Sequence, residues 1–138
     1  MVKNEVVHSS GKRKTAIARV TIKPGNGGVR INSIPLETYS TEAVKMKIKE
    51  VMAVAADHVD LNKLDISVDV RGGGVLGQAD AIASSIARGL SELVGDNLLN
   101  EYVNYNRTLI AGDHRQTEVH KPSQSSKGPR HRRQKSYR

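Results

Sequence analysis

Three glycines, Gly72, Gly74 and Gly77, have the spacing G-x-G-x-x-G between an expected strand and an expected helix. In dinucleotide-binding enzymes this spacing presents backbone N–H groups at a helix N-terminus to a pyrophosphate. RNA phosphate can use the same donors, so the loop could belong to an enzyme or to an RNA-binding protein. A tight turn that only lets the helix pack closely on the strand is a third interpretation, and it is compatible with RNA binding.

The residues around the glycines predict the elements that hold them. Leu64, Ile66, Val68 and Val70 alternate with polar residues, which is typical of a half-buried strand over 64–71. From Ala79 the apolar period becomes helical, and Gly95 is expected to end that helix. Its predicted apolar stripe consists of Ala79, Ile82, Ala83, Ile86, Leu90, Leu93 and Val94, with Asp80, Ser84, Arg88, Ser91 and Glu92 off it.

The segment after Gly95 argues against a dinucleotide site. Such a site requires a second parallel strand that ends in an acidic residue about 20 residues beyond the glycines. Here Leu98, Leu99, Tyr102 and Val103 are spaced as a short second helix, which we expect to end within residues 104–107. The sequence therefore predicts strand, helix, helix.

An enzyme at the glycine loop would also need a general base and a magnesium-binding carboxylate. Asp69 and Asp80 are the available side chains. We expect both to face solvent, with Asp80 at the start of the helix, where a carboxylate suits the helix dipole. A chain of 138 residues also leaves no second lobe to close over a substrate.

A basic segment, Gly11-Lys12-Arg13-Lys14-Thr15, precedes a second expected strand over 16–23. Ala16, Ala18, Val20 and Ile22 form one face of that strand, while Arg19 and Lys23 lie on the other. A short basic run is usually only a solvated surface. Because the cations continue along one strand face, the pattern favours contact with phosphates. Residues 5–8 are expected to form a short first strand.

The remaining pattern completes a small mixed domain. Residues 24–28 predict a turn, and residues 29–32 a strand that forms a hairpin with the preceding strand. A helix is expected after the candidate N-caps Thr38, Ser40 and Thr41, with its lysines on a solvated face. Its predicted stripe is Val44, Ile48, Val51, Met52 and Ala55. Asp57, His58 and Asp60 are adjacent loop residues that rarely converge on one metal ion, so we expect no metal site.

The net charge of +8 is concentrated at the C-terminal end. Residues 1–111 contain 14 Lys and Arg against 12 Asp and Glu, a net charge of +2, whereas residues 112–138 contain 8 against 2, a net charge of +6. Beyond Gly112 the single aliphatic residue is Val119, so this tail cannot bury enough surface to fold alone. Fully extended, it would span roughly 85 Å. A solubilising tail and a segment that orders on RNA through counterion release are both compatible with this composition.

Composition also excludes several classes of protein. The sequence has no cysteine, which excludes disulfide bonds and thiolate metal sites. No apolar run is as long as the about 18 residues that a membrane-spanning helix needs. Residues 1–5 do not resemble a signal peptide, so we expect a cytoplasmic protein. With four Tyr and no Phe or Trp, the core is expected to be thin, and stability without a partner to be marginal.

Three stretches resemble the S-nine family of small-subunit ribosomal proteins. The glycine stretch Gly72-Gly73-Gly74-Val75-Leu76-Gly77-Gln78-Ala79-Asp80-Ala81 is similar to a family motif, and residues 11–20 are close to the opening motif. The ending Gln134-Lys135-Ser136-Tyr137-Arg138 resembles the archaeal and eukaryotic branch, with the archaeal favoured. The resemblance implies an α/β (α+β) fold, a two-layer domain of about four strands backed by helices, similar to the second domain of ribosomal protein S-five. It also implies a long extended C-terminal tail, which divides the chain into a domain over 1–111 and a tail over 112–138.

The resemblance further implies a structural, non-enzymatic protein of the ribosome that needs neither cofactor nor metal, membrane nor small-molecule substrate. Its partners would be ribosomal RNA in the head of the small subunit, neighbouring ribosomal proteins and peptidyl-site tRNA. The tRNA-proximal residues would be Lys135, Ser136, Tyr137 and Arg138. The expected ribosomal RNA contacts are Lys12, Arg13, Lys14, Arg19, Arg71, Gly73, Gly74, Gln78, Arg107, Arg115, Lys121, Lys127, Arg130, Arg132 and Arg133.

Two other functions share parts of this pattern. A nucleotide-phosphate-binding enzyme would use the loop over 72–77, and the S-five-like fold also occurs in small-molecule kinases. A free-standing RNA chaperone would share the charge distribution and differ only in its partner. Replacement of Gly74 by Val is expected to damage folding or assembly through backbone geometry.

Overall fold

The computed structural model of the chain describes residues 6–119 and residue 136. The strands are β1 (Val7–Arg13), β2 (Ala16–Pro24), β3 (Val29–Ile31), β4 (Ile34–Pro35) and β5 (Leu64–Arg71). The α-helices are α1 (Glu42–Ala55), α2 (Val75–Val94) and α3 (Asp96–Ala111), and short 3-10 turns η1 (Leu36–Thr38) and η2 (Leu61–Lys63) connect them. Within the described ranges no helix is both long and apolar enough to span a bilayer.

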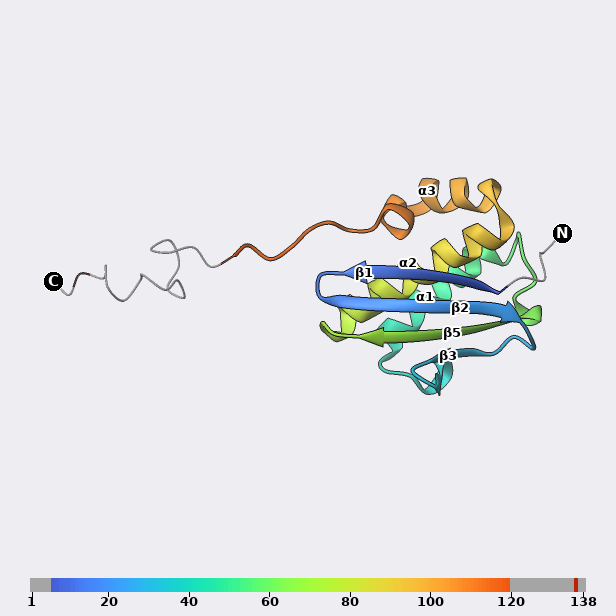
Figure 1. The fold of residues 1–138 in the computed structure, drawn as a ribbon, viewed down its shortest axis with the longest axis horizontal. Helices are drawn as coiled ribbons and strands as arrows, with labels where there is room; N and C mark the ends of the chain where they lie inside the picture. Colours follow the sequence, from blue (N-terminus) through green and yellow to red (C-terminus); the bar gives the residue numbers. More distant parts are fainter. Residues whose placement is uncertain (1–5, 120–135, 137–138) are drawn as a thin grey trace.

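The strands form one sheet in the order β1-β2-β5-β3-β4 (Figure 1). β1 pairs with β2 and β2 with β5, both antiparallel, while β3 runs parallel to β5 and antiparallel to β4. The β1–β2 hairpin and the N-terminus of α2 lie at the end of the sheet from which the tail departs (Figure 1). We call this end the basic end, because Lys12, Lys14 and Arg71 lie there.

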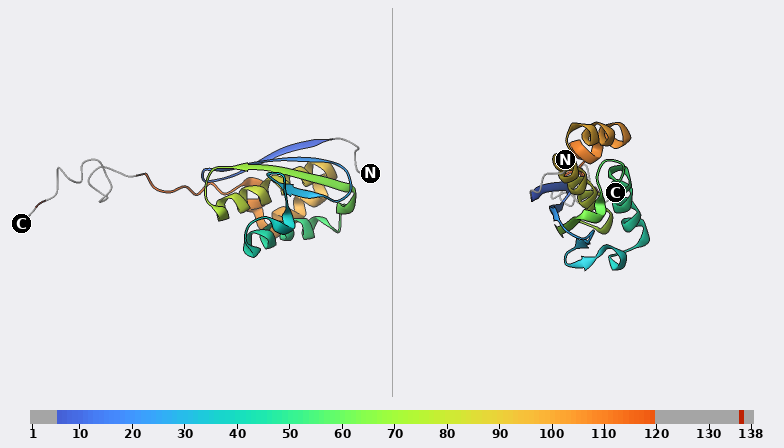
Figure 2. Two further views of the ribbon diagram at one scale, coloured as in Figure 1. Left: turned by 90° about the horizontal axis from the view of Figure 1, so that it is seen from below. Right: turned by 90° about the vertical axis from the view of Figure 1, so that its right-hand side faces the viewer.

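The molecule has two layers, with the helices on one side of the sheet (Figure 2). The alternation along β2 and β5 explains this, because Ala16, Ala18, Val20 and Ile22 and their β5 counterparts are buried while the residues between them are mostly exposed. This confirms the predicted α/β domain of strands backed by helices. The sheet has one strand more than the four expected, a two-residue β4 that folds back on β3.

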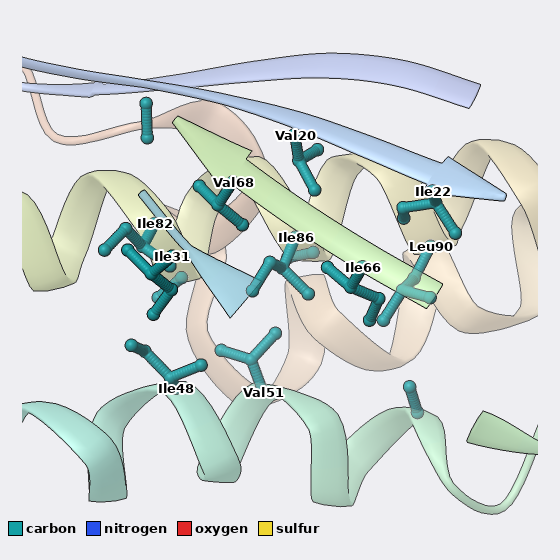
Figure 3. Packing of buried hydrophobic residues seen from close by; sticks show 14 of the residues in the cluster. Val20, Ile22, Ile31, Ile48, Val51, Ile66, Val68, Ile82, Ile86 and Leu90 are labelled. Atoms are coloured by element: carbon teal, nitrogen blue, oxygen red, sulfur yellow. The ribbon is translucent and has the colours of Figure 1, made fainter. Parts of the chain in front are cut away.

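The core lies between the sheet and the helices and is almost entirely aliphatic (Figure 3). Ile48 and Val51 from α1 face Ile82 and Ile86 from α2, and the strand residues Ile31 and Ile66 lie beside Ile82 and Ile86. Tyr102 of α3 is fully buried, and its hydroxyl donates to the carbonyl of Val51 over 2.7 Å. That hydrogen bond satisfies the polar end of the ring and joins α3 to α1.

Two strand predictions need correction. The first strand was expected over 5–8 but runs from Val7 to Arg13, so Lys12 and Arg13 of the basic segment are strand residues. β3 does not form a hairpin with β2, because β5 lies between them. The side chain of Asn32 fixes this arrangement, since its oxygen accepts from Val70 N over 2.9 Å and its amide donates to Val70 O over 3.2 Å.

The helices α2 and α3 are longer than predicted, and α2 buries more residues than its predicted apolar stripe. α2 begins at Val75 rather than Ala79, and Ser84 and Ser91, which we expected off the apolar stripe, are buried. α3 does not end within 104–107 but continues to Ala111 after a break at Asn106, whose φ of −157° and ψ of 102° are not helical. Asn106 Oδ1 then accepts from Thr108 N over 3.0 Å, which starts the helix again in a new direction.

Candidate nucleic-acid interface

Residues 112–115, here called the tail root, are attached to the domain by Arg13. Arg13 and Asp113 form an isolated parallel β-bridge. The Arg13 guanidinium donates to the carbonyl of Arg115 over 2.8 Å, and its Nη2 lies 3.3 Å from Asp113 Oδ2. The Arg13 side chain is only 14% exposed, so this predicted RNA contact faces the protein rather than solvent.

Asp113 also binds Arg115, the second residue after it. Arg115 Nη2 lies 2.6 Å from Asp113 Oδ2, and the Arg115 backbone N–H donates to Asp113 Oδ1 over 3.0 Å. These bonds to Arg115, with the charge of Arg13 adding to them, hold the pKa of Asp113 well below its usual range. The carboxylate therefore stays charged at neutral pH and keeps both arginines in place.

Two side chains of α2 hold the end of α3 in position. Ser84 Oγ donates to the carbonyl of Leu109 over 2.7 Å, and Arg88 Nε donates to that of Ile110 over 2.8 Å. Arg88 Nη1 also reaches the carbonyl of Ser10 in β1 over 2.9 Å. Because these carbonyls belong to the last turn of α3, their partners fix where the tail begins. Sequence reasoning missed both side chains, since each was assigned only to the polar side of a helix.

A hollow of about 340 Å³ lies between α1, α2 and the break in α3. It contains both signs of charge, because Lys47 Nζ lies 2.5 Å from Asp80 Oδ1 and Arg13 Nε lies 3.9 Å from Asp80 Oδ2. Asp80 is thus the sixth residue of α2 and ion-paired, not a free carboxylate at the helix start, and Lys47 is not merely solvated.

A second hollow, of about 610 Å³, opens beside the tail root and is more basic. We call it the tail-root hollow; it is lined by Lys12, Lys14, Arg88, Arg107, Thr108, Ala111, Gly112, Asp113, His114 and Gln116. Within residues 6–119, no carboxylate lies within ion-pair distance of Lys12, Lys14 or Arg107. Three predicted RNA contacts from β1, the hairpin and α3 therefore meet in one place.

The glycine loop joins β5 to α2 at the same end of the sheet. Gly72 and Gly73 have positive φ, +76° and +68°, and Gln78 Nε2 donates to the carbonyl of Gly72 over 3.0 Å. A Cβ at Gly73 would lie 2.8 Å from the Cβ of Ala16, so this glycine is required by the packing of the loop on β2. Gly74, in contrast, is the extended N-cap of α2, and a Cβ there would meet nothing within 4 Å. The backbone geometry that we expected to require glycine at position 74 is therefore found at Gly72 and Gly73 instead.

The two carboxylates that an enzyme at the glycine loop would need, Asp69 and Asp80, do not lie together. Asp69 is exposed on the side of the sheet without helices, whereas Asp80 lies on the helix side with Lys47. No group of three or more His, Asp or Glu gathers as metal ligands in the described part of the chain. His58 instead pairs with Glu101, which links the end of α1 to α3.

The tail beyond the root has little structure of its own in the part described. Residues 114–119 are exposed and form neither helix nor strand, and they lead away from the domain (Figure 1). Ser136 is also exposed. The other predicted tail contacts lie outside the described residues; they are Lys121, Lys127, Arg130, Arg132, Arg133, Lys135, Tyr137 and Arg138.

Comparison with known proteins places the chain among ribosomal proteins. Residues 11–138 match the family model described as "Ribosomal protein S9/S16". The small ribosomal subunit protein uS9 of Methanococcus maripaludis (strain C7) is 47% identical over 135 residues, which cover 97% of this chain and 99% of the relative. The protein of the same name from Methanococcus vannielii is 48% identical with the same coverage.

Proposed function

Because the chain belongs to the ribosomal protein S9/S16 family, we propose that its domain docks on ribosomal RNA in the head of the small subunit and its tail reaches the anticodon stem-loop of peptidyl-site tRNA. The family and its Methanococcus relatives confirm the resemblance, including its archaeal type. The protein is a structural constituent of the small ribosomal subunit, works in the ribosome in the cytoplasm and is not an enzyme. Its partners are ribosomal RNA and neighbouring ribosomal proteins.

The position of the tail relative to the cations is the observation that supports the finer proposal. The tail root leaves the domain at the basic end, beside the hollow that Lys12, Lys14 and Arg107 line. A backbone phosphate bound in this hollow would release counterions and lie next to the first residues of the tail. Docking of the domain and entry of the tail into RNA would then begin at the same point.

The charge distribution supports a division of labour between domain and tail. Residues 1–111 carry a net charge of +2, so the domain gains RNA affinity from placed cations rather than from overall charge. Residues 112–138 carry a net charge of +6 and lack a core of their own, which suits a segment that becomes ordered along RNA. The domain would fix the position of the protein on ribosomal RNA, and the tail would extend from it to the tRNA.

Deletion of Lys135 to Arg138 tests the assignment of the tail. Subunits reconstituted with the shortened protein should assemble normally and bind peptidyl-site tRNA about tenfold more weakly, because charge-assisted bonds are lost. Lys135→Gln with Arg138→Gln removes two charges at the end of the tail and should lower tRNA affinity. The matched control, Lys121→Gln with Lys127→Gln, removes two charges earlier in the tail and should lower tRNA affinity less. Defective assembly with normal tRNA affinity would contradict the proposal.

A further inference from the structure

The side of the sheet away from the helices, here called the open sheet face, has no helix over it among the described residues (Figure 2). The outward side chains of β1, β2, β5 and β3 form this face, because strand residues alternate between the two sides. Five of them are cationic and exposed: Lys12, Arg19, Lys23, Arg30 and Arg71. Five exposed cations on one uncovered face suggest that this face binds an anionic partner.

Two carboxylates, Asp65 and Asp69, share this face with the five cations, which leaves a net charge of +3. Asp65 is bound to the neighbouring turn, since its Oδ1 accepts from the backbone N–H groups of Asn26 over 2.9 Å and Gly28 over 3.0 Å. Its charge is thus directed at the turn that links β2 to β3. Asp69 is the remaining carboxylate between the cations.

Two of the five cations, Arg19 and Arg71, line a hollow on this face. Ile17, Arg19, Asp69 and Arg71 enclose about 360 Å³. Their register places Arg19 opposite Asp69 and Ile17 opposite Arg71. Neither arginine is within ion-pair distance of a carboxylate in residues 6–119, so both guanidinium groups are available to an external anion.

The side chains on this face indicate what kind of anion fits. Sheets that bind single-stranded bases do so by stacking them on aromatic rings. The sequence has no Phe or Trp, and none of the three Tyr within residues 6–119 lies on β1, β2, β3 or β5. Arginine forks beside an exposed aliphatic side chain, Ile17 at 47% exposure, suit phosphate oxygens and the sugar edge of a nucleic-acid backbone.

We propose that the open sheet face binds the backbone of a second RNA segment, separate from the RNA at the tail-root hollow. The hollow lined by Ile17, Arg19, Asp69 and Arg71 shares no lining residue with the tail-root hollow. Lys12, on the edge strand β1, belongs to the open sheet face and also lines the tail-root hollow, so it lies where the two sites meet. A single RNA backbone in one of them would leave the other accessible. The protein would therefore connect two RNA segments, and this inference rests on the proposed ribosomal role.

The test compares salt dependence of binding to small-subunit ribosomal RNA for full-length variants. Arg19→Gln with Arg71→Gln should reduce the slope of log affinity against log salt concentration by about 2. The charge-preserving pair Arg19→Lys with Arg71→Lys should keep the slope, and a thermal melt of each variant checks its folding. Lys49→Gln with Lys63→Gln removes the same charge from exposed sites away from the basic end and should also keep it.

The outcomes separate the two proposals. Suppose that the wild type stays bound in high salt and that the Arg19→Gln/Arg71→Gln variant shows the same slope of log affinity against log salt concentration as the wild type. The open sheet face then does not bind RNA, and this inference fails while the proposed function stands. If that variant binds free RNA normally but assembles poorly into subunits, the face binds an acidic protein surface instead, which also overturns the inference. If the wild type itself shows no specific binding, the proposed function fails with it.

Discussion

Arg13 and Asp113 are 100 positions apart in the chain, yet the arginine Nη2 lies 3.3 Å from the aspartate Oδ2 and their backbones form a parallel bridge. This pairing ties the tail root to β1. The predicted boundary at residue 111 therefore falls before residues that are tied to β1, and for truncation experiments we place the cut after Val119.

Replacement of Asp113 by Asn should release the tail root. The neutral amide keeps the shape of the side chain but loses the charge that holds Arg13 and Arg115. Trypsin should then cleave after Arg115 faster than in the wild type, while cleavage at exposed Lys49 provides the internal control. An unchanged rate at Arg115 would show that the backbone bridge alone holds this segment.

The contribution of Asp113 should disappear in acid. Contacts with Arg115 and then Arg13 lower its pKa in the folded protein, so it stabilises the fold above its unfolded value of about 3.9. The contribution is lost as pH falls through the folded-state pKa. The difference in melting temperature between wild type and Asp113→Asn should stay constant from about pH 7 to 5 and shrink below about 4. A difference that grows in acid would contradict this sign.

Cations of the tail-root hollow should contribute individually to RNA affinity. Lys14→Gln with Arg107→Gln should reduce the salt slope of binding to small-subunit ribosomal RNA by about 2, because two phosphate contacts are removed. The combination with Arg19→Gln and Arg71→Gln should give the sum of both reductions if the sites are independent. A double variant with the wild-type slope would exclude the hollow from the interface.

Gly73 should be far less replaceable than Gly74. Alanine at Gly73 has to adopt a φ of +68° and would meet Ala16, so the free energy of unfolding should fall by about 1–3 kcal/mol. Alanine at Gly74 has open space and an ordinary φ, and should cost less than about 1 kcal/mol. Urea unfolding of both variants gives the comparison, and equal losses would refute the geometric reason.

Tyr102 should stabilise the domain through both its ring and its hydroxyl. Tyr102→Phe leaves the ring in place and removes the bond to Val51, which should lower the free energy of unfolding by about 1 kcal/mol. Tyr102→Ala also leaves a cavity and should cost about 3–5 kcal/mol. Urea titration of the two variants checks the order, and an equal loss in both would mean that the ring contributes little.

Alternation along the chain predicted the parts of the fold that have large apolar residues on one face. The strand over 64–71 was predicted with the bounds that the structure shows, because Leu64, Ile66, Val68 and Val70 all face the core. β1 was underestimated because its inward residues include Ser9 and Gly11, which do not form an apolar pattern. Gly11 packs so closely on α2 that a Cβ would lie 2.3 Å from the carbonyl oxygen of Ala81, a contact that the sequence alone does not reveal.

Tertiary partners were the information that local pattern could not supply. The strand at 29–31 was recognised, but its pairing with β5 depends on the side chain of Asn32 reaching Val70. In the candidate site, Lys12, Lys14 and Arg107 were expected to contact RNA, and the structure brings them together. The roles of Ser84, Arg88 and Asp113 could not be foreseen, because each binds a backbone or side-chain group distant in sequence.

The most direct test of a docking domain with a penetrating tail is co-sedimentation with small subunits assembled without this protein. Full-length protein is compared with a version that ends at Val119, in low and high salt. We predict that the full-length protein stays bound in high salt and that the shortened protein still binds, but more weakly. If neither resists salt, binding is only the attraction of a polycation for RNA, and the account of a placed domain and tail is contradicted.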